Sequence, residues 1–407
     1  MRWSGLFVSR ALMTAVLAGS PLPAMAQSAT TPDDAPIQIG PVALAPSIRL
    51  TNIGHDSNVY HQSDDPASDV TATASPSARA WLRLPVLRVA GRSQADFIYF
   101  HRLTDLRAVD TDHFARVEVP LNWLMPYVEG NRASTRHQRN LEIDAPVKRL
   151  NETQRAGVDV RVTGKFTVGL TAQRSRIRYS GDTLYFGSDL AELLNRRGDG
   201  EGVRLRYAVT PLTSVGVTAE QQRDRFDAAV ERDANSIWVL PEVEFQPFAL
   251  VSGRAQIGFR RRSFVNTELP NFGGTAARVD LRYTLLGRTQ FGVGVQRDLE
   301  YSYRFEQEEY LLSGVRVSVN HQLAEPWNVG LYLGRFHLDY RLVGSDRALA
   351  EASGYVETYV SVGAGVGYRM GRSRLALQVD FDDRDSTVST FRYYQRLRIT
   401  SSLSHDF

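Results

Sequence analysis

An alternation of apolar and polar residues recurs along the chain from residue 48 onward. In GVRLRYAVT, for example, valine, leucine and tyrosine side chains alternate with Arg204 and Arg206. The same pattern recurs in GVDVRVTG, RVDLRYTLLG, GVRVSVNHQ and RLALQVDFDD. Because successive side chains of a strand point to opposite faces, each segment predicts a strand with one apolar face and one strongly polar face.

The height of the apolar faces and the charge of the polar ones predict how these strands assemble. An apolar face of about four or five residues on a tilted strand matches a hydrocarbon band about 25 Å tall. A charge facing lipid costs about 2–4 kcal/mol at the bilayer midplane, so we expect the charges on the other face, toward a wet lumen. The alternative is a large soluble β-sandwich, in which the apolar face would form a core.

Short and long links alternate between the predicted strands. The short links are residues 210–214, 285–289, 324–328 and 369–373, and the long ones are 142–153, 180–200, 266–274 and 342–355. Outer-membrane barrels combine short periplasmic turns with long outer loops. The sequence therefore predicts an all-β fold, a transmembrane antiparallel up-and-down β-barrel of about 18 strands (16–18), with both ends in the periplasm.

Two segments depart from plain alternation. SDLAELLNRR (188–197) favours a single helix inside a long loop. In GLYLGRFHLDY the apolar phase changes between Leu333 and Phe336, which predicts a β-bulge at Gly334–Arg335.

The first residues have the features of a secretory signal peptide. Two arginines precede a short apolar run, and Ala24 and Ala26 form a small-x-small cleavage site before Gln27. The run is too short for a membrane-spanning helix. We expect residues 1–26 to be the signal peptide, 27–45 a periplasmic N-terminal tail and 46–407 the barrel domain. The chain has no cysteine, so disulfides contribute nothing to its stability.

The two ends of the predicted barrel carry a family resemblance. The opening segment PSIRLTNIGHDSNVY ends in DSNVY, and the last segment, LRITSSLSHDF, alternates up to Phe407. With the hairpins between them, they resemble the outer-membrane β-barrel porin family associated with exopolysaccharide biosynthesis and export operons. The resemblance covers nearly the whole mature chain and implies a place in the bacterial cell outer membrane. It also implies that Phe407 is the signal read by the barrel-assembly machinery. We interpret Asp56, Asn58 and Tyr60 as a strand-end turn with local side-chain bonds.

The predicted lumen is the most informative surface. Its candidate substrate-path residues are basic or acidic and lie on polar strand faces: Arg161, Arg204, Arg206, Arg254, Arg282, Arg316, Arg392, Arg396, Arg398, Glu242 and Glu244. In one interpretation, arginine and carboxylate pairs brace the wall. In the other, a cationic strip attracts an anionic or hydroxyl-rich polymer, with arginines gripping carboxylates.

Signatures of catalysis and of cofactor binding are missing from the sequence. There is no G-x-S-x-G, H-E-x-x-H or P-loop motif, and the glycines of GAGVG fit a lumen-facing strand side or close packing. The acids of FDDRDS and the histidines and acids between His101 and His113 fit solvated strand ends and loops. We therefore expect no enzyme activity, no cofactor and no metal. The formal net charge of +3, without a basic run, argues against nucleic acid.

These observations favour an outer-membrane channel serving exopolysaccharide export or secretion. The alternatives are a general or small-solute uptake porin, an outer-membrane enzyme acting on lipid or glycan, and a structural barrel with a plugged lumen. The expected partners are outer-membrane lipid, the barrel-assembly machinery, polysaccharide and periplasmic export components.

Overall fold

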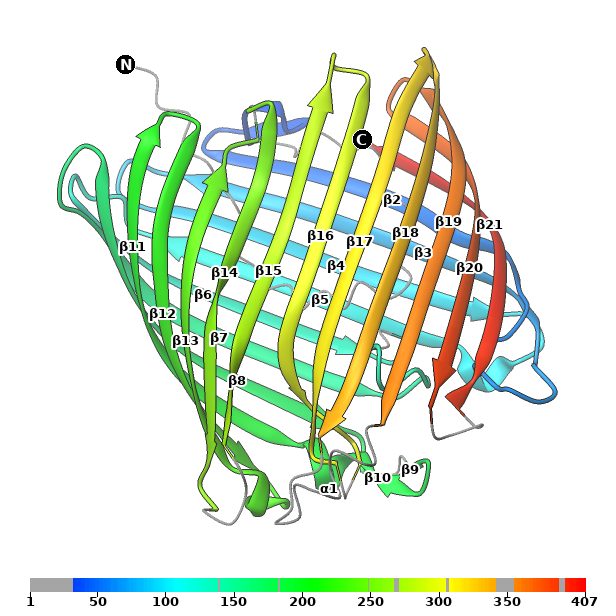
Figure 1. Ribbon diagram of the computed structural model, residues 1–407. Helices are drawn as coiled ribbons and strands as arrows, with labels where there is room; N and C mark the ends of the chain where they lie inside the picture. The colour runs from blue at the N-terminus through cyan, green and yellow to red at the C-terminus, as the bar shows by residue number, and fades with distance from the viewer. Residues whose placement is uncertain are drawn as a thin grey trace.

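Eighteen antiparallel strands close into a barrel (Figure 1). The computed structural model describes residues 32–137, 140–181, 184–247, 249–266, 271–304, 307–341, 355–387 and 392–407. The wall consists of β2 (Val42–Asp56), β3 (Asp69–Arg83), β4 (Arg88–Phe100), β5 (Ala108–Glu118), β6 (Leu124–Thr135), β7 (Arg149–Arg161), β8 (Phe166–Tyr179), β11 (Arg196–Thr210), β12 (Thr213–Phe226), β13 (Ala234–Phe245), β14 (Val251–Phe264), β15 (Phe272–Leu285), β16 (Thr289–Tyr301), β17 (Glu309–Ala324), β18 (Trp327–Arg341), β19 (Val356–Met370), β20 (Ser373–Ser386) and β21 (Tyr394–Asp406). The predicted fold class and strand number are confirmed.

Each wall strand pairs with its neighbours in sequence, and β2 pairs with β21 to close the barrel. The turn after β2 reinforces this seam. The Asp56 carboxylate pairs with Arg396 and accepts the backbone N–H of Asn58 at 3.1 Å, while Leu397 N donates to Ser57 Oγ at 2.8 Å. The DSN stretch is thus a strand-end turn held by local bonds, as its sequence indicates.

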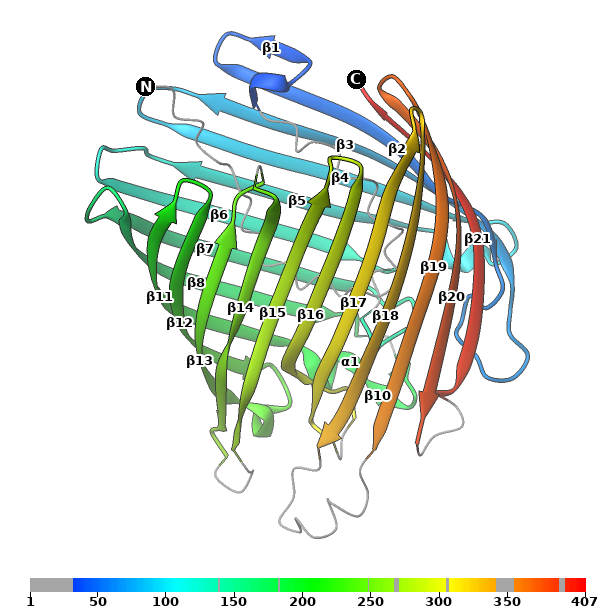
Figure 2. The ribbon, with the colours of Figure 1, turned by 45° about the horizontal axis from the view of Figure 1, so that its top comes forward.

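Short and long links lie at opposite ends of the barrel (Figure 1). The chain starts its first wall strand at Val42, at the end that carries the short turns and the C-terminus, and β1 (Ile37–Ile39) folds back there onto β2 (Figure 2). Residues 1–31, which contain the predicted signal peptide and cleavage site, lie outside the described residues. By the rule for outer-membrane barrels, the short-turn end is periplasmic.

One of the long links contains small elements of its own. Between β8 and β11 lie β9 (Leu184–Tyr185), β10 (Ser188–Asp189) and the helix α1 (Leu190–Leu194), which confirms the predicted loop helix. Asp189 caps this helix by accepting the N–H groups of Ala191 and Glu192 at 2.8 and 3.2 Å. Short 3-10 turns also occur at Pro32–Asp34, Thr104–Leu106 and Val230–Arg232. No helix in the described ranges is long and apolar enough to cross a bilayer.

The two faces of the wall confirm the alternation. On β11, Val203, Leu205 and Tyr207 are exposed on the outside of the barrel, whereas Arg204 between them is buried on the inside. Comparable exposed aliphatic residues occur on the outer face of most wall strands. The barrel thus has an apolar exterior and a polar lumen, the reverse of a water-soluble fold.

The expectation that charges face only the lumen is wrong. On β8, the outer face continues from the exposed Leu170 to Arg174, Arg176 and Arg178, all in the half of the strand nearest the long links. The cost of a charged side chain on this face falls toward zero near the membrane interface. These arginines therefore lie where the wall leaves the hydrocarbon region.

The predicted β-bulge at Gly334–Arg335 is also absent. The pairing of β17 with β18 runs without interruption through these residues, and its register shift lies between Gln322 and Ala324 instead. Phe336, which suggested the phase change, faces inward and is only 1% exposed. Its ring lies over Gly314, where a side chain would overlap it. The strand keeps its phase because this part of the lumen is apolar and covered.

Candidate functional site

The lumen wall carries arginines that share carboxylates across neighbouring strands. Arg204 on β11 pairs with Glu242 and Glu244 on β13, with Nη2 to Glu244 Oε2 at 3.1 Å. Arg254 on β14 reaches the other Glu244 oxygen at 2.7 Å. All of these except Arg254 are buried. The structure thus brings four predicted lumen residues together in one bracing network, as expected for facing opposite charges.

A second network lines the lumen at the seam of the barrel. Arg396 pairs with Asp56, and Arg398 approaches Asp380 at 3.5 Å and Asp382 at 3.8 Å. Both aspartates are buried and face inward. The expectation of a solvated strand end is therefore wrong for Asp382, because Arg398 and the Tyr359 hydroxyl hold it inside the wall. No group of three or more histidine, cysteine or acidic residues that could hold a metal ion occurs among the described residues.

The remaining predicted lumen residues are more loosely held. Arg282 contacts Asp280 at 3.5 Å, and both side chains are largely exposed. The Arg316 guanidinium lies 5.1 Å from the centre of the Tyr332 ring, a cation–π geometry. Arg161 is the last residue of β7 and lies at the periplasmic end. These residues line the lumen from β15, β17 and the end of β7.

Several arginines in the periplasmic half of the lumen have no carboxylate partner. Arg79, Arg206 and Arg374 form no ion pair within the described ranges. Arg79 lies directly across the strand pair from Arg92, which itself contacts Asp112 at 3.1 Å. These arginines give this end of the lumen an excess of positive charge. Like charges directly opposite each other on paired strands are destabilising, so the stability of the wall does not explain this excess.

The outer half of the lumen contains a segment that sequence reasoning missed. Residues 140–147, here called the crossing segment, follow β6 but contact the far side of the barrel. Leu141 is 4% exposed and packs with Tyr310, Phe336 and Leu338, which face inward from β17 and β18. Since β6 and β17 are far apart around the wall, the segment crosses the barrel interior.

Asp144 is the main ionic anchor of the crossing segment. Its carboxylate contacts Arg384 at 3.1 Å and Arg392 at 3.4 Å, and accepts the Tyr185 hydroxyl at 2.5 Å. Both arginines also pair with Glu357 of β19, which is 0% exposed. Arg392 therefore belongs to this anchor, and it lies just before β21 rather than within a strand as predicted.

Glu142 provides a second, titratable anchor. Its carboxylate accepts the Ser302 hydroxyl at 2.6 Å and the Tyr303 N–H at 3.3 Å. Burial raises the pKa of the Glu142 carboxyl from 4.5 to about 7, although the nearby Arg392 guanidinium opposes that shift. The proton on Glu142 is thus exchanged near neutral pH while the segment is docked.

Backbone groups complete the docking. Arg384 donates to the Leu141 carbonyl at 2.7 Å, and Arg392 donates to the Glu142 carbonyl at 2.6 Å. The His61 ring Nδ1 lies 3.0 Å from the Asp144 carbonyl. These bonds satisfy the polar backbone of an irregular segment inside the barrel, which would otherwise be costly to bury.

The link between β8 and β11 covers the crossing segment. Ile143 and Val147 share a buried cluster with Leu190, Leu193 and Leu194 of α1. Burial raises the pKa of the Tyr185 hydroxyl, which bonds to Asp144, well above its ordinary value. The two loops therefore form one layer in the outer part of the barrel. The apolar residues of NLEIDAPV and the inward Phe336 are sequence signals of a buried loop. Neither signal shows which part of the opposite wall the loop contacts.

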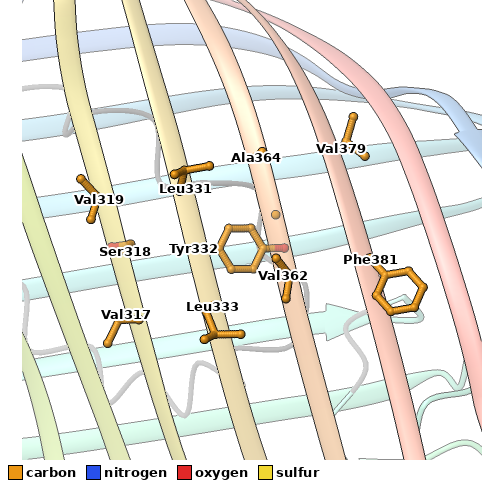
Figure 3. A pocket seen from close by; sticks show the side chains of 11 residues that line it. Val317, Ser318, Val319, Leu331, Tyr332, Leu333, Val362, Ala364, Val379 and Phe381 are labelled. Carbon is orange, nitrogen blue, oxygen red and sulfur yellow. The ribbon is translucent and has the colours of Figure 1, made fainter.

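An apolar hollow lies on the outer face of the barrel (Figure 3). It has a volume of about 420 Å³ and spans β17 to β20. Its outward side chains are aliphatic or aromatic, including Val317, Leu331, Leu333, Val362 and Phe381. Such a lining fits lipid chains and provides no group that could recognise a polar solute.

An apolar outer band, a charged lumen and links of unequal length at the two ends define a porin-like outer-membrane β-barrel. The particular family follows from the sequence: residues 32–401 match the model of the family described as Putative beta-barrel porin 2. The chain belongs to this family. A comparison with curated protein sequences gives no match.

Solved structures of other barrels are similar at low sequence identity. OpdK of Pseudomonas aeruginosa, solved with vanillate, is 10% identical with a TM-score of 0.49, over 89% of this chain and 99% of that chain. OccAB4 of Acinetobacter baumannii is 12% identical with a TM-score of 0.46, over 89% and 98%. The siderophore receptor PirA of Pseudomonas aeruginosa is 9% identical with a TM-score of 0.43, over 89% and 80%.

Proposed function

We propose that this barrel is a channel for small anionic solutes and that the crossing segment restricts its outer half. The observation that carries the proposal is the docking of Asp144 onto Arg384 and Arg392 on the far side of the lumen. A segment held across the interior narrows the lumen. A narrower lumen excludes a thick polymer before it excludes a small solute. The alternative of small-solute uptake is therefore favoured over an open polysaccharide conduit.

The charge of the solute is inferred from the wall. The unpaired Arg79, Arg206 and Arg374 lie in the periplasmic half, beyond the crossing segment. Arginine donates fixed pairs of N–H groups that match carboxylates and phosphates. We infer that a solute entering past the crossing segment meets this basic region, and that anions are preferred over cations.

Exopolysaccharide export is the second candidate, because the family resemblance implies it. It requires the crossing segment to leave the lumen. The crossing segment is held by ion pairs between side chains and by hydrogen bonds from side chains to its backbone, and not by strand pairing. Its release would therefore leave the wall intact. Under this candidate, polysaccharide and periplasmic export components are the partners.

The test is single-channel conductance of the refolded mature chain in planar bilayers. The Asp144→Ala variant removes the ionic anchor, and Asp383→Ala, an outward acid of β20, is the matched control. The proposal expects a small wild-type current that increases in Asp144→Ala only, with no block by anionic polysaccharide in the wild type. A large wild-type current that anionic polysaccharide blocks would favour the export candidate.

The other expectations remain proposals. We propose that the chain acts without a catalytic step or a cofactor, and that Phe407 directs it to the barrel-assembly machinery. Phe407 is half exposed after the end of β21, and its N–H lies 3.4 Å from the Pro46 carbonyl.

A further inference from the structure

The outer face of the wall carries a concentrated group of arginines on three adjacent strands. This basic belt consists of Arg174, Arg176 and Arg178 on β8, Arg197 on β11, and Arg223 and Arg225 on β12. Every one of these side chains is at least 42% exposed. They alternate with inward residues such as Gln173, which bonds to Arg155 inside the lumen. The belt therefore faces outward.

Strand register aligns the belt in rows around the barrel. Arg197 pairs with Arg176 on one side and with Arg225 on the other, so three arginines stand side by side with no acid between them. The row nearer the membrane reads Arg174, Asp199, Arg223. Strand spacing makes a row of three about 10 Å wide.

The apolar surface begins one row below the belt. Continuing in register toward the periplasm, the outward row is first Ala172, Glu201 and Gln221 and then the apolar Leu170, Val203 and Ala219. A lipid-facing charge is costly at the midplane and costs nearly nothing at the interface. The belt consequently lies at the level of lipid headgroups, on the side of the long links and thus of the outer leaflet.

Every arginine of the belt has an acidic neighbour, but five acids face six arginines. Asp199 is shared by Arg174 and Arg197, at 2.7 and 2.5 Å. Arg178, Arg223 and Arg225 approach Glu152, Glu201 and Asp233 at 3.0, 3.0 and 3.7 Å. The Arg176 guanidinium reaches only Asp227, at 3.9 Å, and that contact is half exposed. Exposed ion pairs of this kind contribute little to stability, so fold stability does not explain the clustering.

The opposite side of the barrel lacks such a belt. The outward charges in the outer halves of β18 and β20 are Arg335, Asp339, Asp383 and Asp385, mostly acidic. Among the described residues, outward arginines that stand in register on adjacent strands thus occur on one side of the barrel. A general attraction between the barrel and charged lipid would not require this uneven distribution of arginines.

We propose that the basic belt binds the phosphorylated sugar headgroup of an outer-leaflet glycolipid of the lipid A class. The guanidinium rows match phosphate oxygens in charge and geometry, since arginine binds phosphate through two parallel N–H donors. The acyl chains of the same lipid lie against Leu170, Val203 and their neighbours. The glycolipid is bound to the outside of the wall, independently of any solute in the lumen.

Native mass spectrometry of the refolded mature chain in detergent tests the proposal, with lipid A as the added probe. The variant Arg176→Gln/Arg197→Gln/Arg225→Gln removes the row of three, and Arg335→Gln is the control on the opposite side. Each arginine near a charged lipid contributes about a factor of five in affinity, so we expect about 100-fold weaker binding in the triple variant at low salt. The control changes binding less than twofold, and dephosphorylated lipid A binds as weakly to the wild type as lipid A binds to the triple variant.

Heat-modifiable gel mobility verifies that each variant is folded. If the triple variant does not fold, Arg176→Gln alone is measured, with an expected loss of about fivefold. Equal binding of lipid A by wild type and variant, or an equal loss in Arg335→Gln, would overturn the proposal. Equally tight binding of dephosphorylated lipid A or of phosphatidylglycerol would overturn it as well, because either result removes the phosphorylated sugar as the recognised group.

Discussion

The docking of the crossing segment should respond to pH through Glu142. The perturbation is a change from pH 5 to pH 8, compared between the wild type and Glu142→Gln. In the docked segment, burial raises the pKa of the Glu142 carboxyl from 4.5 to about 7. A carboxyl released into water would return to its ordinary value. Between these two values the docked form retains a proton that the released form loses.

The sign and size of the effect follow from this difference. Below about pH 4.5 both forms are protonated and docking is strongest. As the pH rises through this window, deprotonation of Glu142 favours release, and the total effect is about 3 kcal/mol, roughly 300-fold in the docking equilibrium. Above about pH 7, the docking equilibrium no longer changes with pH through Glu142. Acid therefore holds the segment in place, and mildly alkaline solution loosens it.

The assay is single-channel recording in symmetric salt, with the fraction of time in the higher-conductance state measured at each pH. Glu142→Gln keeps the hydrogen bond from Ser302 but cannot ionise, so its recordings should be alike at pH 5 and pH 8. Glu308 is a necessary control because burial also raises its pKa to about 7 and it lies in the outer link between β16 and β17, which also carries Ser302. Glu308→Gln should retain the wild-type response. A pH response that persists unchanged in Glu142→Gln would refute the reasoning.

Three further predictions concern the lumen, the assembly and the packing. Arg79→Gln should lower the anion-to-cation permeability ratio about twofold, because it removes an unpaired charge opposite Arg92. Reversal potentials in a salt gradient measure this ratio. An unchanged ratio would show that Arg79 does not face the solute. Removal of Phe407 should reduce the amount of assembled barrel in outer membranes while leaving refolding of the purified chain into detergent unchanged, and equal loss in both assays would point to a stability effect instead. Gly314→Ala should destabilise the barrel by about 1–3 kcal/mol in urea unfolding, since the added methyl overlaps the Phe336 ring.

The barrel itself could be predicted from the sequence because its information is local. Alternation in segments such as GVRLRYAVT sets the two faces of a strand, and the lengths of the links set the two ends. Strand number, antiparallel order and the helix Leu190–Leu194 all follow from such short-range signals, and the structure confirms them.

The parts that failed depend on contacts between distant segments. Phe336 suggested a bulge because an apolar residue on the lumen-facing side interrupts the expected alternation. It is apolar because it packs with Leu141, which lies almost two hundred residues away in the chain. The outward arginines of β8 were not anticipated, because the alternation does not show where along a strand the hydrocarbon ends. Arg392 was placed in a strand, whereas its acidic partner Asp144 comes from the crossing segment.

The seam between β2 and β21 has a consequence for the order of folding. Asp56 and Arg396 are 340 positions apart, whereas every other pairing between described wall strands joins strands that are consecutive along the chain. Hairpins can therefore form early at low entropic cost, but the seam requires nearly the whole chain to be in place. Until β21 arrives, β2 and β20 each present an unpaired edge that could recruit a foreign strand or leave open hydrogen bonds in lipid. Protection from aggregation is thus gained in a single late event, when the last strand meets the first.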